Sequence, residues 1–303
     1  MKVFLTGATG YVGSVVAEKL LAKGHEVGGL VRSEASEAKL PDRKVIPIRG
    51  DLGDFDVLKK GAAEADAVIH TAFNHDFSDY NDAVKLDRNV IATFAEALEG
   101  TKKPFIITSS SAILGDTTGV EADEDYPFDQ YSPRILRGES ERDVLSLSSN
   151  GVRSIVLRLP LFVYGRAGSS FVPYIIKQAK DTGAASYAES GSQKVSAVHV
   201  EDAADMYLLA LETTTAKGLY NIASESVSLK ELNEAAARLL NIEAKSIPVE
   251  KAKAQFGGMF NFLSINNELS SEKAKRDLGW KARNIAILDD IENGSYRKFK
   301  EEE

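Results

Sequence analysis

The 303-residue chain is 43% hydrophobic and carries a formal net charge of -8, with 37 basic and 45 acidic residues. This composition supports a folded core and excludes the basic surface that binds nucleic acid or an anionic membrane. The chain has no cysteine and only four scattered histidines. Disulfides and thiolate metal sites are therefore excluded, and no metal site is predicted.

No apolar run approaches the roughly 18 residues that cross a bilayer. Residues 1–6 pass directly into the first predicted strand, without a signal sequence. We therefore expect a cytoplasmic protein that acts on a small molecule and contacts neither a membrane nor nucleic acid. The sequence leaves both a monomer and a homodimer open.

Residues 1–13 combine an apolar strand (MKVFLT), a glycine-rich turn and the start of a helix. Gly7 permits a tight turn, Gly10 lets the backbone approach a phosphate, and Gly13 lets the helix pack closely on the strand. The phosphates of a dinucleotide would meet the free N–H groups at the start of this helix. The predicted cofactor-binding residues here are Gly7, Thr9, Gly10, Tyr11, Val12 and Gly13.

Short apolar runs and helical segments alternate through the first half of the chain. Further strands are predicted at residues 26–31, 44–48, 67–71, 105–108 and 154–159. This alternation is typical of an α/β protein with a doubly wound parallel sheet, the Rossmann fold. Ligands of such sheets lie beyond the carboxyl ends of the strands, so the residues that follow each strand are the candidate functional residues.

Strand two ends at Arg32 and Ser33, where an acidic residue would bind the ribose 2′-hydroxyl of NAD. An arginine favours the 2′-phosphate instead, and NADP (NADPH) is the predicted cofactor. After strand three, Asp51 could accept a hydrogen bond from the adenine amino group, with Leu52 beside it. Asp51 could also be the N-cap of a helix that starts near residue 54.

The ends of the later strands complete the predicted cofactor site. Strand four leads into Thr71, Ala72 and Phe73, which would let the cofactor lie across the sheet, and strand six leads into Pro160. Strand five opens into three consecutive serines at residues 109–111, whose hydroxyls could bind a carbonyl oxygen beside the nicotinamide.

The second half of the chain changes character. Helices are predicted at residues 171–183, from 197 onward, and at 229–240, 270–278 and 287–299, with a returning strand at 219–222. These elements indicate a smaller, discontinuous C-terminal α/β lobe. We place a dinucleotide-binding domain at residues 1–165 plus about 190–227, and a substrate-binding lobe at about 166–189 plus 228–303.

These landmarks, in this order, resemble the extended short-chain dehydrogenase/reductase superfamily over nearly the whole chain. Residues 6–13 match its T-G-x-x-G-x-x-G motif, Asp51 and Leu52 its adenine motif, and residues 199–204 (HVEDAA) its H-V-x-D-x-A segment. Residues 89–93 (NVIAT) match its N-x-x-G-T helix, with alanine in place of glycine. The resemblance implies that Asn89 lies at the cofactor.

The resemblance also implies a catalytic serine, tyrosine and lysine. In the superfamily the serine holds the substrate oxygen and the tyrosine transfers the proton. The lysine binds the nicotinamide ribose and lowers the pKa of the tyrosine. Alignment on Gly115 places Ser110 at the serine, with Ser109 and Ser111 as close competitors.

The chain departs from the superfamily at the tyrosine and the lysine. If Glu141 matches the acidic residue that usually follows the lysine by four positions, Arg137 occupies the lysine position and Pro133 the tyrosine position. Tyr131 lies two residues away, in a loop whose proline directs it differently from a helical side chain. These changes resemble an atypical branch with uncharacterised yeast members, in which basic residues replace the usual pair.

Arginine stays protonated, so Arg137 can bind ribose hydroxyls and stabilise an oxyanion but cannot donate a proton. The proton would come from Tyr131, a serine relay or water. The catalytic candidates are therefore Ser110, Ser109, Arg137 and Tyr131. The predicted function is a slow or atypical NADP(H)-dependent oxidoreductase that reduces a small-molecule carbonyl substrate.

Two alternatives remain open. The chain could be a catalytically weak NADP(H)-binding sensor, because an intact nucleotide site stands beside altered catalytic residues. It could also be a sugar-nucleotide epimerase or dehydratase, although Ser111 and Ala112 stand where a dehydratase carries Asp-Glu. Substrate specificity is expected around His75 and Phe77, in residues 164–187 and in the C-terminal lobe.

Overall fold

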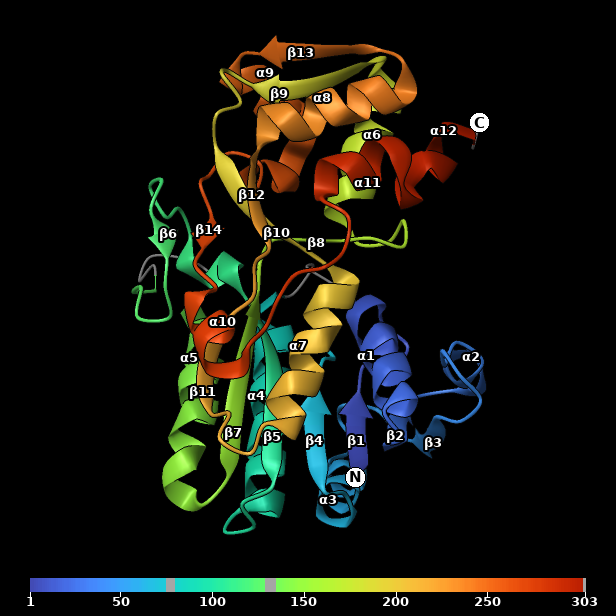
Figure 1. Ribbon diagram of the computed structural model, residues 1–303, viewed down its shortest axis with the longest axis vertical. Helices are drawn as coiled ribbons and strands as arrows, with labels where there is room; N and C mark the ends of the chain where they lie inside the picture. Colours follow the sequence, from blue (N-terminus) through green and yellow to red (C-terminus); the bar gives the residue numbers. More distant parts are fainter. Residues whose placement is uncertain (75–79, 129–134, 302–303) are drawn as a thin grey trace.

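The computed structural model of the chain describes residues 1–74, 80–128 and 135–301 (Figure 1). A seven-stranded sheet runs in the order β11-β7-β5-β4-β1-β2-β3, with every neighbouring pair parallel. Its strands are β1 (Lys2–Thr6), β2 (Glu26–Val31), β3 (Ile46–Arg49), β4 (Ala67–His70), β5 (Pro104–Ser110), β7 (Arg153–Leu159) and β11 (Gly218–Asn221). The central strands are buried on both faces, which is why they are continuous apolar runs.

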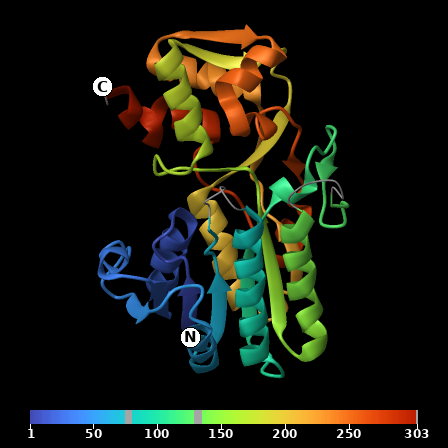
Figure 2. The same ribbon diagram turned by 180° about the vertical axis from the view of Figure 1, so that it is seen from behind.

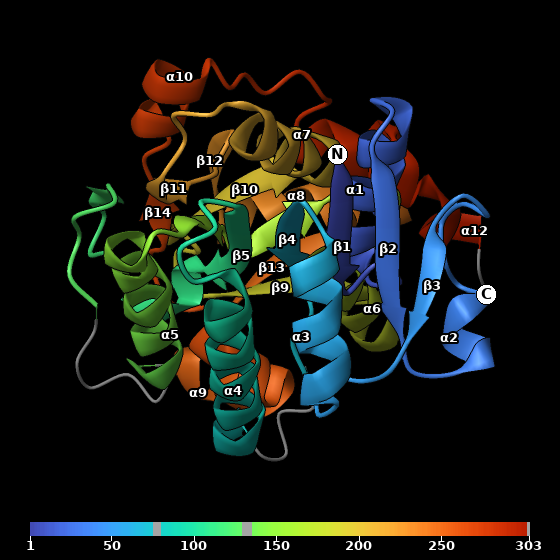
Figure 3. The same cartoon turned by 90° about the horizontal axis from the view of Figure 1, so that it is seen from below.

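Helices cover both faces of this sheet (Figure 1, Figure 2 and Figure 3). One face carries α1 (Tyr11–Ala22) and α7 (Val200–Glu212). The other face carries α3 (Phe55–Glu64), α4 (Tyr80–Leu98) and α5 (Ile135–Ser146). A single turn, α2 (Glu34–Glu37), follows β2. The sheet is therefore doubly wound, as predicted.

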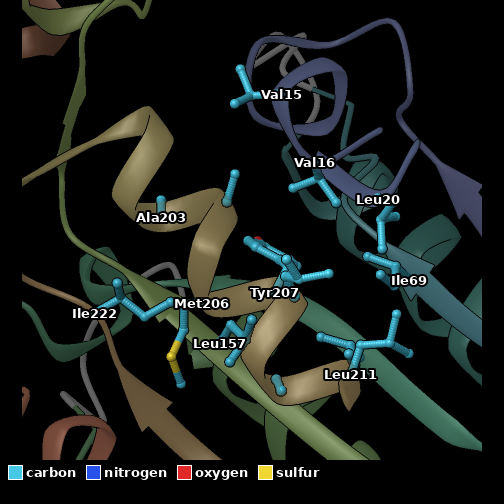
Figure 4. Close-up of a cluster of buried hydrophobic side chains, with 14 of the residues drawn as sticks. Val15, Val16, Leu20, Ile69, Leu157, Ala203, Met206, Tyr207, Leu211 and Ile222 are labelled. Carbon is cyan, nitrogen blue, oxygen red and sulfur yellow. The ribbon is translucent and has the colours of Figure 1, made fainter. Parts of the chain in front are cut away.

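The core lies between the sheet and these two helical layers. On the α1 and α7 side, side chains spaced three or four residues apart form one apolar stripe on each helix (Figure 4). This cluster includes Val15, Val16 and Leu20 of α1, Met206, Tyr207 and Leu211 of α7, Ile69 of β4 and Leu157 of β7. On the other side, Phe94 of α4 packs edge-on against Phe4 and Phe105, with ring centroids 6.0 and 5.5 Å apart.

A lobe with its own hydrophobic cluster lies beyond the carboxyl edge of the sheet (Figure 1). Its elements are α6 (Phe171–Thr182), β9 (Ala184–Ala188), α8 (Leu229–Leu240), β13 (Glu243–Ile247), α9 (Val249–Phe256), the 3₁₀ turn η4 (Gly257–Asn261), α11 (Ile287–Asn293), η5 (Ser295–Arg297) and α12 (Lys298–Glu301). The strands β9 and β13 pair in parallel.

Short strands and turns connect the sheet to this lobe. The strands β8 (Phe162–Tyr164), β10 (Lys194–His199) and β12 (Glu225–Ser228) form a three-stranded sheet, and β6 (Glu121–Ala122) pairs with β14 (Glu268–Leu269). The remaining elements are η2 (Ser111–Leu114), η3 (Leu147–Asn150) and α10 (Glu272–Leu278). The strands β8, β10 and β12 join the two parts. The structure therefore marks no sharp boundary between them, and the domain limits stay a prediction.

The observed elements confirm the predicted parallel sheet, and each predicted strand ends within two residues of the observed one. The lobe agrees less well. The helix predicted at residues 287–299 is interrupted at Gly294, and β9, β10, β12 and β13 were not predicted. The strand β13 (EAKSI) is largely exposed and mixed in composition, so it has no apolar run that would mark a strand.

A buried ion pair joins α5 to β7. The guanidinium of Arg158 donates to both carboxylate oxygens of Glu141, at 3.1 and 2.6 Å, and to Asn221 Oδ1 at 3.2 Å. Both charged side chains are at most 1% exposed. Glu141, the residue that aligned Arg137 with the lysine position, therefore has a structural role in this chain.

The variant Glu141→Ala would leave the Arg158 charge buried without its partner. We expect the free energy of unfolding to fall by about 3–5 kcal/mol. Urea unfolding followed by circular dichroism measures this change. The control Glu250→Ala breaks an exposed pair with Lys253 and should cost less than about 1 kcal/mol. Equal losses in the two variants would contradict the role given to this ion pair.

Candidate functional site

The first glycines form a turn into which no side chain fits. Gly7 has a φ of +80°, and a Cβ there would lie 2.5 Å from Thr71 Oγ1. A Cβ on Gly13 would lie 2.1 Å from the Gly7 carbonyl oxygen and 2.6 Å from Thr71 Oγ1. The hydroxyl of Thr71 in turn donates to the Thr6 carbonyl at 2.8 Å. The start of α1 is thus pressed against the ends of β1 and β4.

The start of α1 is open to a ligand. Gly10 is its N-cap residue, is exposed and supplies no side-chain cap. The backbone N–H groups of Tyr11, Val12 and Gly13 donate to no group in the described part of the chain. Thr9 lies half-buried in the preceding turn. Unsatisfied N–H groups and the positive end of the helix dipole together suit a phosphate.

The Tyr11 side chain points away from this anion site. Its hydroxyl donates to the Gly165 carbonyl at 2.7 Å, and burial raises its pKa well above the usual range. The loop that it contacts bends sharply, with positive φ at Arg166, Ala167 and Ser169. Tyr11 therefore offers its backbone N–H, not its phenol, to a ligand at α1.

Arg32 and Ser33 differ in their freedom to bind a ligand. The exposed guanidinium of Arg32 makes no hydrogen bond or ion pair with any residue that the structure describes. The Ser33 hydroxyl accepts the Ser36 N–H at 3.2 Å as the N-cap of α2. Arg32 is thus available for a negatively charged group at the end of β2, whereas Ser33 is engaged locally.

Asp51 is not the N-cap of the following helix, so that alternative was wrong. α3 begins at Phe55, and Asp54 holds the N-cap position. Asp51 Oδ1 accepts the Gly53 N–H at 2.7 Å, which closes a short turn. Leu52 is half-buried against the apolar cluster on the α3 and α4 face.

Arg137 reaches the ends of two strands from α5. Its Nη2 donates to the Thr108 carbonyl of β5 at 3.2 Å. Its guanidinium carbon lies 3.7 Å from the centroid of the Phe73 ring, which follows β4. A planar guanidinium on an aromatic face is a favourable cation–π arrangement. Arg137 and Phe73 were both predicted to bind the cofactor, and in the structure they are in contact.

A buried polar chain under Arg137 was missed by the sequence analysis. His70 Nδ1 lies 2.6 Å from Thr6 Oγ1, and His70 Nε2 lies 3.1 Å from Asp87 Oδ1. Burial opposes ionisation of Asp87, but the hydrogen bond from His70 and the charge on Arg137 hold its pKa below the usual range. An anionic carboxylate therefore lies beneath the strand ends. The available signal was a histidine ending an otherwise apolar strand.

The three serines after β5 have different surroundings. Ser110 is half-buried, and its Oγ accepts the Ala112 N–H at 3.2 Å. Ser109 and Ser111 are at most 3% exposed, and neither hydroxyl has a partner among the described residues. Ser110 is therefore the member of the group nearest to solvent, although it is also engaged in its own turn.

Asn89 lies on the exposed side of α4. Its backbone carbonyl accepts the Thr93 hydroxyl at 2.9 Å. Since two residues along a helix are about 200° apart, Asn89 lies opposite Asp87, which contacts the strand ends through His70. The cofactor contact implied for Asn89 stays a prediction.

The other predicted residues have simple placements. Ala72 is half-buried between Thr71 and Phe73, and Pro160 is buried directly after β7. His199 caps α7, its Nδ1 accepting the Glu201 N–H at 3.2 Å, which gives it a structural role. The predictions for Tyr131, Pro133, His75 and Phe77 fall outside the described residues.

No group of three or more metal-binding side chains occurs in the described ranges. Within the same ranges, no helix is long and apolar enough to cross a bilayer.

Comparisons with known proteins identify the family. The family model described as NAD dependent epimerase/dehydratase family matches residues 3–223. An uncharacterised Schizosaccharomyces pombe protein is 42% identical over 299 residues, covering 98% of this chain and 100% of that protein.

A more distant relative from Stigmatella aurantiaca is a 4-hydroxy-2-methyl-3-oxo-4-farnesyl-3,4-dihydroquinoline-1-oxide ketoreductase. It is 28% identical over 266 residues, covering 84% of this chain and 78% of that protein.

A solved structure shares the fold. The dTDP-glucose 4,6-dehydratase DesIV from Streptomyces venezuelae, with NAD and TYD bound, has a TM-score of 0.80 at 17% identity, covering 99% of this chain and 97% of that chain. The family match and the yeast relative confirm the predicted family. The chain belongs to the NAD dependent epimerase/dehydratase family of the extended short-chain dehydrogenase/reductase superfamily.

Proposed function

We propose that the chain binds NADP(H) and uses it to reduce a small carbonyl compound. The observation that carries this proposal is the position of Arg137, whose guanidinium contacts Phe73 and the Thr108 carbonyl two residues before Ser110. A carbonyl that accepts a hydride develops negative charge on its oxygen. A fixed cation at the carboxyl edge of the sheet would stabilise that charge.

In this proposal, different residues of the site bind different parts of the cofactor. The open N–H groups of α1 suit the pyrophosphate, and the carboxylate of Asp51 suits the adenine amino group. Arg32, which has no partner among the described residues, stands where NAD-specific proteins place an acid, and this supports the 2′-phosphate of NADP(H). The open groups on α1, β2 and β5 all lie at the carboxyl edge of one sheet.

The nicotinamide would supply the hydride, and the protein residues would hold the substrate. Ser110 can donate its hydroxyl proton in a hydrogen bond to the carbonyl oxygen while its Oγ still accepts the Ala112 N–H. Arg137 stabilises the developing alkoxide and binds ribose hydroxyls. The anionic Asp87 beneath the strand ends balances the charge of Arg137 in the ground state.

The proton donor is open among Tyr131, a serine relay and water. Tyr207 is a poor candidate, because its hydroxyl is fully buried, lies 2.6 Å from Thr108 Oγ1 and has a pKa raised by burial. A missing positioned acid costs roughly 10² to 10⁴ in rate. We therefore expect slow turnover.

An NADP(H) sensor without turnover is the second candidate, because Pro133 and Arg137 occupy the expected tyrosine and lysine positions. The likeness to DesIV supports the fold alone, and Ser111 and Ala112 at the dehydratase acid positions argue against a dehydratase. The relative named as a ketoreductase supports carbonyl reduction.

The test mixes purified protein with NADPH and a panel of aldehydes, ketones and diketones. Loss of absorbance at the nicotinamide band supports a reductase. Saturable NADPH binding without turnover on the whole panel supports the sensor. Absence of NADPH and NADH binding by calorimetry, with native protein, overturns both proposals.

Cofactor preference is tested by Arg32→Asp. We expect NADPH binding to weaken roughly 10- to 100-fold, the equivalent of losing hydrogen bonds to a charged group, while NADH binding changes little. Calorimetric titration with each nucleotide measures both. The control Lys251→Asp makes the same charge change on the exposed side of α9 and should leave both affinities unchanged. Equal losses for NADPH and NADH would remove the 2′-phosphate assignment.

The role of Arg137 is tested by its removal. We expect Arg137→Ala to lower kcat roughly 10²- to 10³-fold, the cost of losing one group that stabilises an oxyanion, and Arg137→Lys to retain part of the rate because the charge remains. The control Arg142→Ala removes an exposed arginine of the same helix, which packs on Phe128 4.7 Å away. Unchanged turnover and NADPH affinity in Arg137→Ala would show that the guanidinium lies outside the reaction site.

A further inference from the structure

We propose that Asn267 is a positioning residue for the serine turn, which we define as residues 109–115. This inference rests on the proposed function, because Ser110 belongs to that turn. Asn267 comes from the far end of the chain and is fully buried. Its side-chain Nδ2 donates to the carbonyl oxygens of Ser111, at 3.1 Å, and Gly115, at 2.9 Å.

Ser109 and Ser110 of the serine turn still lie in β5, paired with Arg158 and Leu159 of β7, but the residues that follow them have little support of their own. The serine turn contains one 3₁₀ turn of four residues, η2, whose closing bond from the Gly115 N–H to the Ala112 carbonyl is 3.4 Å long. Gly115 has a φ of +67°, so the chain leaves the turn in a conformation suited to glycine. The two bonds from Asn267, to Ser111 and Gly115, hold η2 at both ends and fix the direction in which the turn leaves β5.

Asn267 can do this because its own backbone is fixed. Its N–H donates to the Lys194 carbonyl at 2.8 Å, and its carbonyl accepts the Ser196 N–H at 2.9 Å. Asn267 therefore forms an isolated parallel β-bridge with Val195 of β10. The neighbouring Asn266 carbonyl accepts the Thr117 N–H at 2.8 Å. Residues 266–267 therefore join the serine turn to a strand that leads into the lobe.

The chemistry at this position requires an amide. An asparagine presents a neutral donor to two carbonyl oxygens, whereas an aspartate of the same shape would present lone pairs to both. The Oδ1 atom of Asn267 is buried and has no partner among the described residues, so the interaction with the turn is made through Nδ2. A displacement of the turn would redirect the Ser110 hydroxyl, and errors of about 1 Å in a reacting group cost roughly 100-fold in rate.

The key variant is Asn267→Asp, which keeps the shape and removes the donor. With a substrate found on the carbonyl panel, we expect kcat to fall roughly 10- to 100-fold while NADPH affinity stays within about twofold, because α1 is untouched. Lower pH should restore part of the rate relative to the parent chain, since a protonated carboxyl can again donate to a carbonyl oxygen. A kcat that stays low at every pH would contradict a role for the hydrogen-bond donor at this position.

The matched control is Asn233→Asp in α8. Asn233 is also buried, and its Nδ2 donates to the Leu229 carbonyl at 2.8 Å, but it belongs to the lobe and not to the serine turn or its contacts. We expect this control to lose stability without a specific loss of kcat. Equal kcat losses in the two variants, following their losses in stability, would overturn the proposal.

Hydrogen exchange gives a readout that needs no substrate. In Asn267→Asp, and in Asn267→Ala as a second variant, amides of residues 109–118 should exchange faster while those of residues 3–20 stay protected. Unchanged exchange in the serine turn overturns the positioning role. If the parent chain reduces nothing on the panel but exchange rises as expected, the proposed function fails and the positioning of the turn stands.

Discussion

The close contact of Gly7, Gly13 and Thr71 is the constraint on which the site depends. It brings the start of α1 to the ends of β1 and β4, where any larger residue at either glycine would meet backbone or hydroxyl oxygen within 2.6 Å. The strand order then places β2 on one side of this contact and β5 on the other. An anion site, Arg32 and the serine turn consequently share one edge of the sheet.

The sequence predicted those parts of the fold whose signals are local. The continuous apolar strands, the glycine turn and the helix α8 with its N-cap Ser228 could be read from neighbouring residues alone. The strands β9 and β13 could not, because each acquires its conformation by pairing with a segment more than 50 residues away. Such a pairing cannot be predicted from the composition of neighbouring residues.

The same distinction divides the site. Arg32, Asp51 and the serines follow strands, so their positions at the edge of the sheet follow from topology. The hydrogen bonds that link Thr6, His70 and Asp87 join three elements. Asn267 reaches the serine turn from 156 residues away in sequence. The cofactor contact of Asn89 rests on a motif match alone and stays a prediction.

The contacts of Arg137 fit an arginine better than the lysine that the superfamily carries at this position. A lysine ammonium is a point charge, whereas the flat face of Phe73, 3.7 Å away, matches a planar guanidinium. The Thr108 carbonyl accepts one of its N–H groups, and Asp87 supplies negative charge held in place by His70. A lysine would interact less favourably with each of these groups. The cation at this position is therefore permanent, and in the proposed reaction it would stabilise an oxyanion while another group transfers the proton.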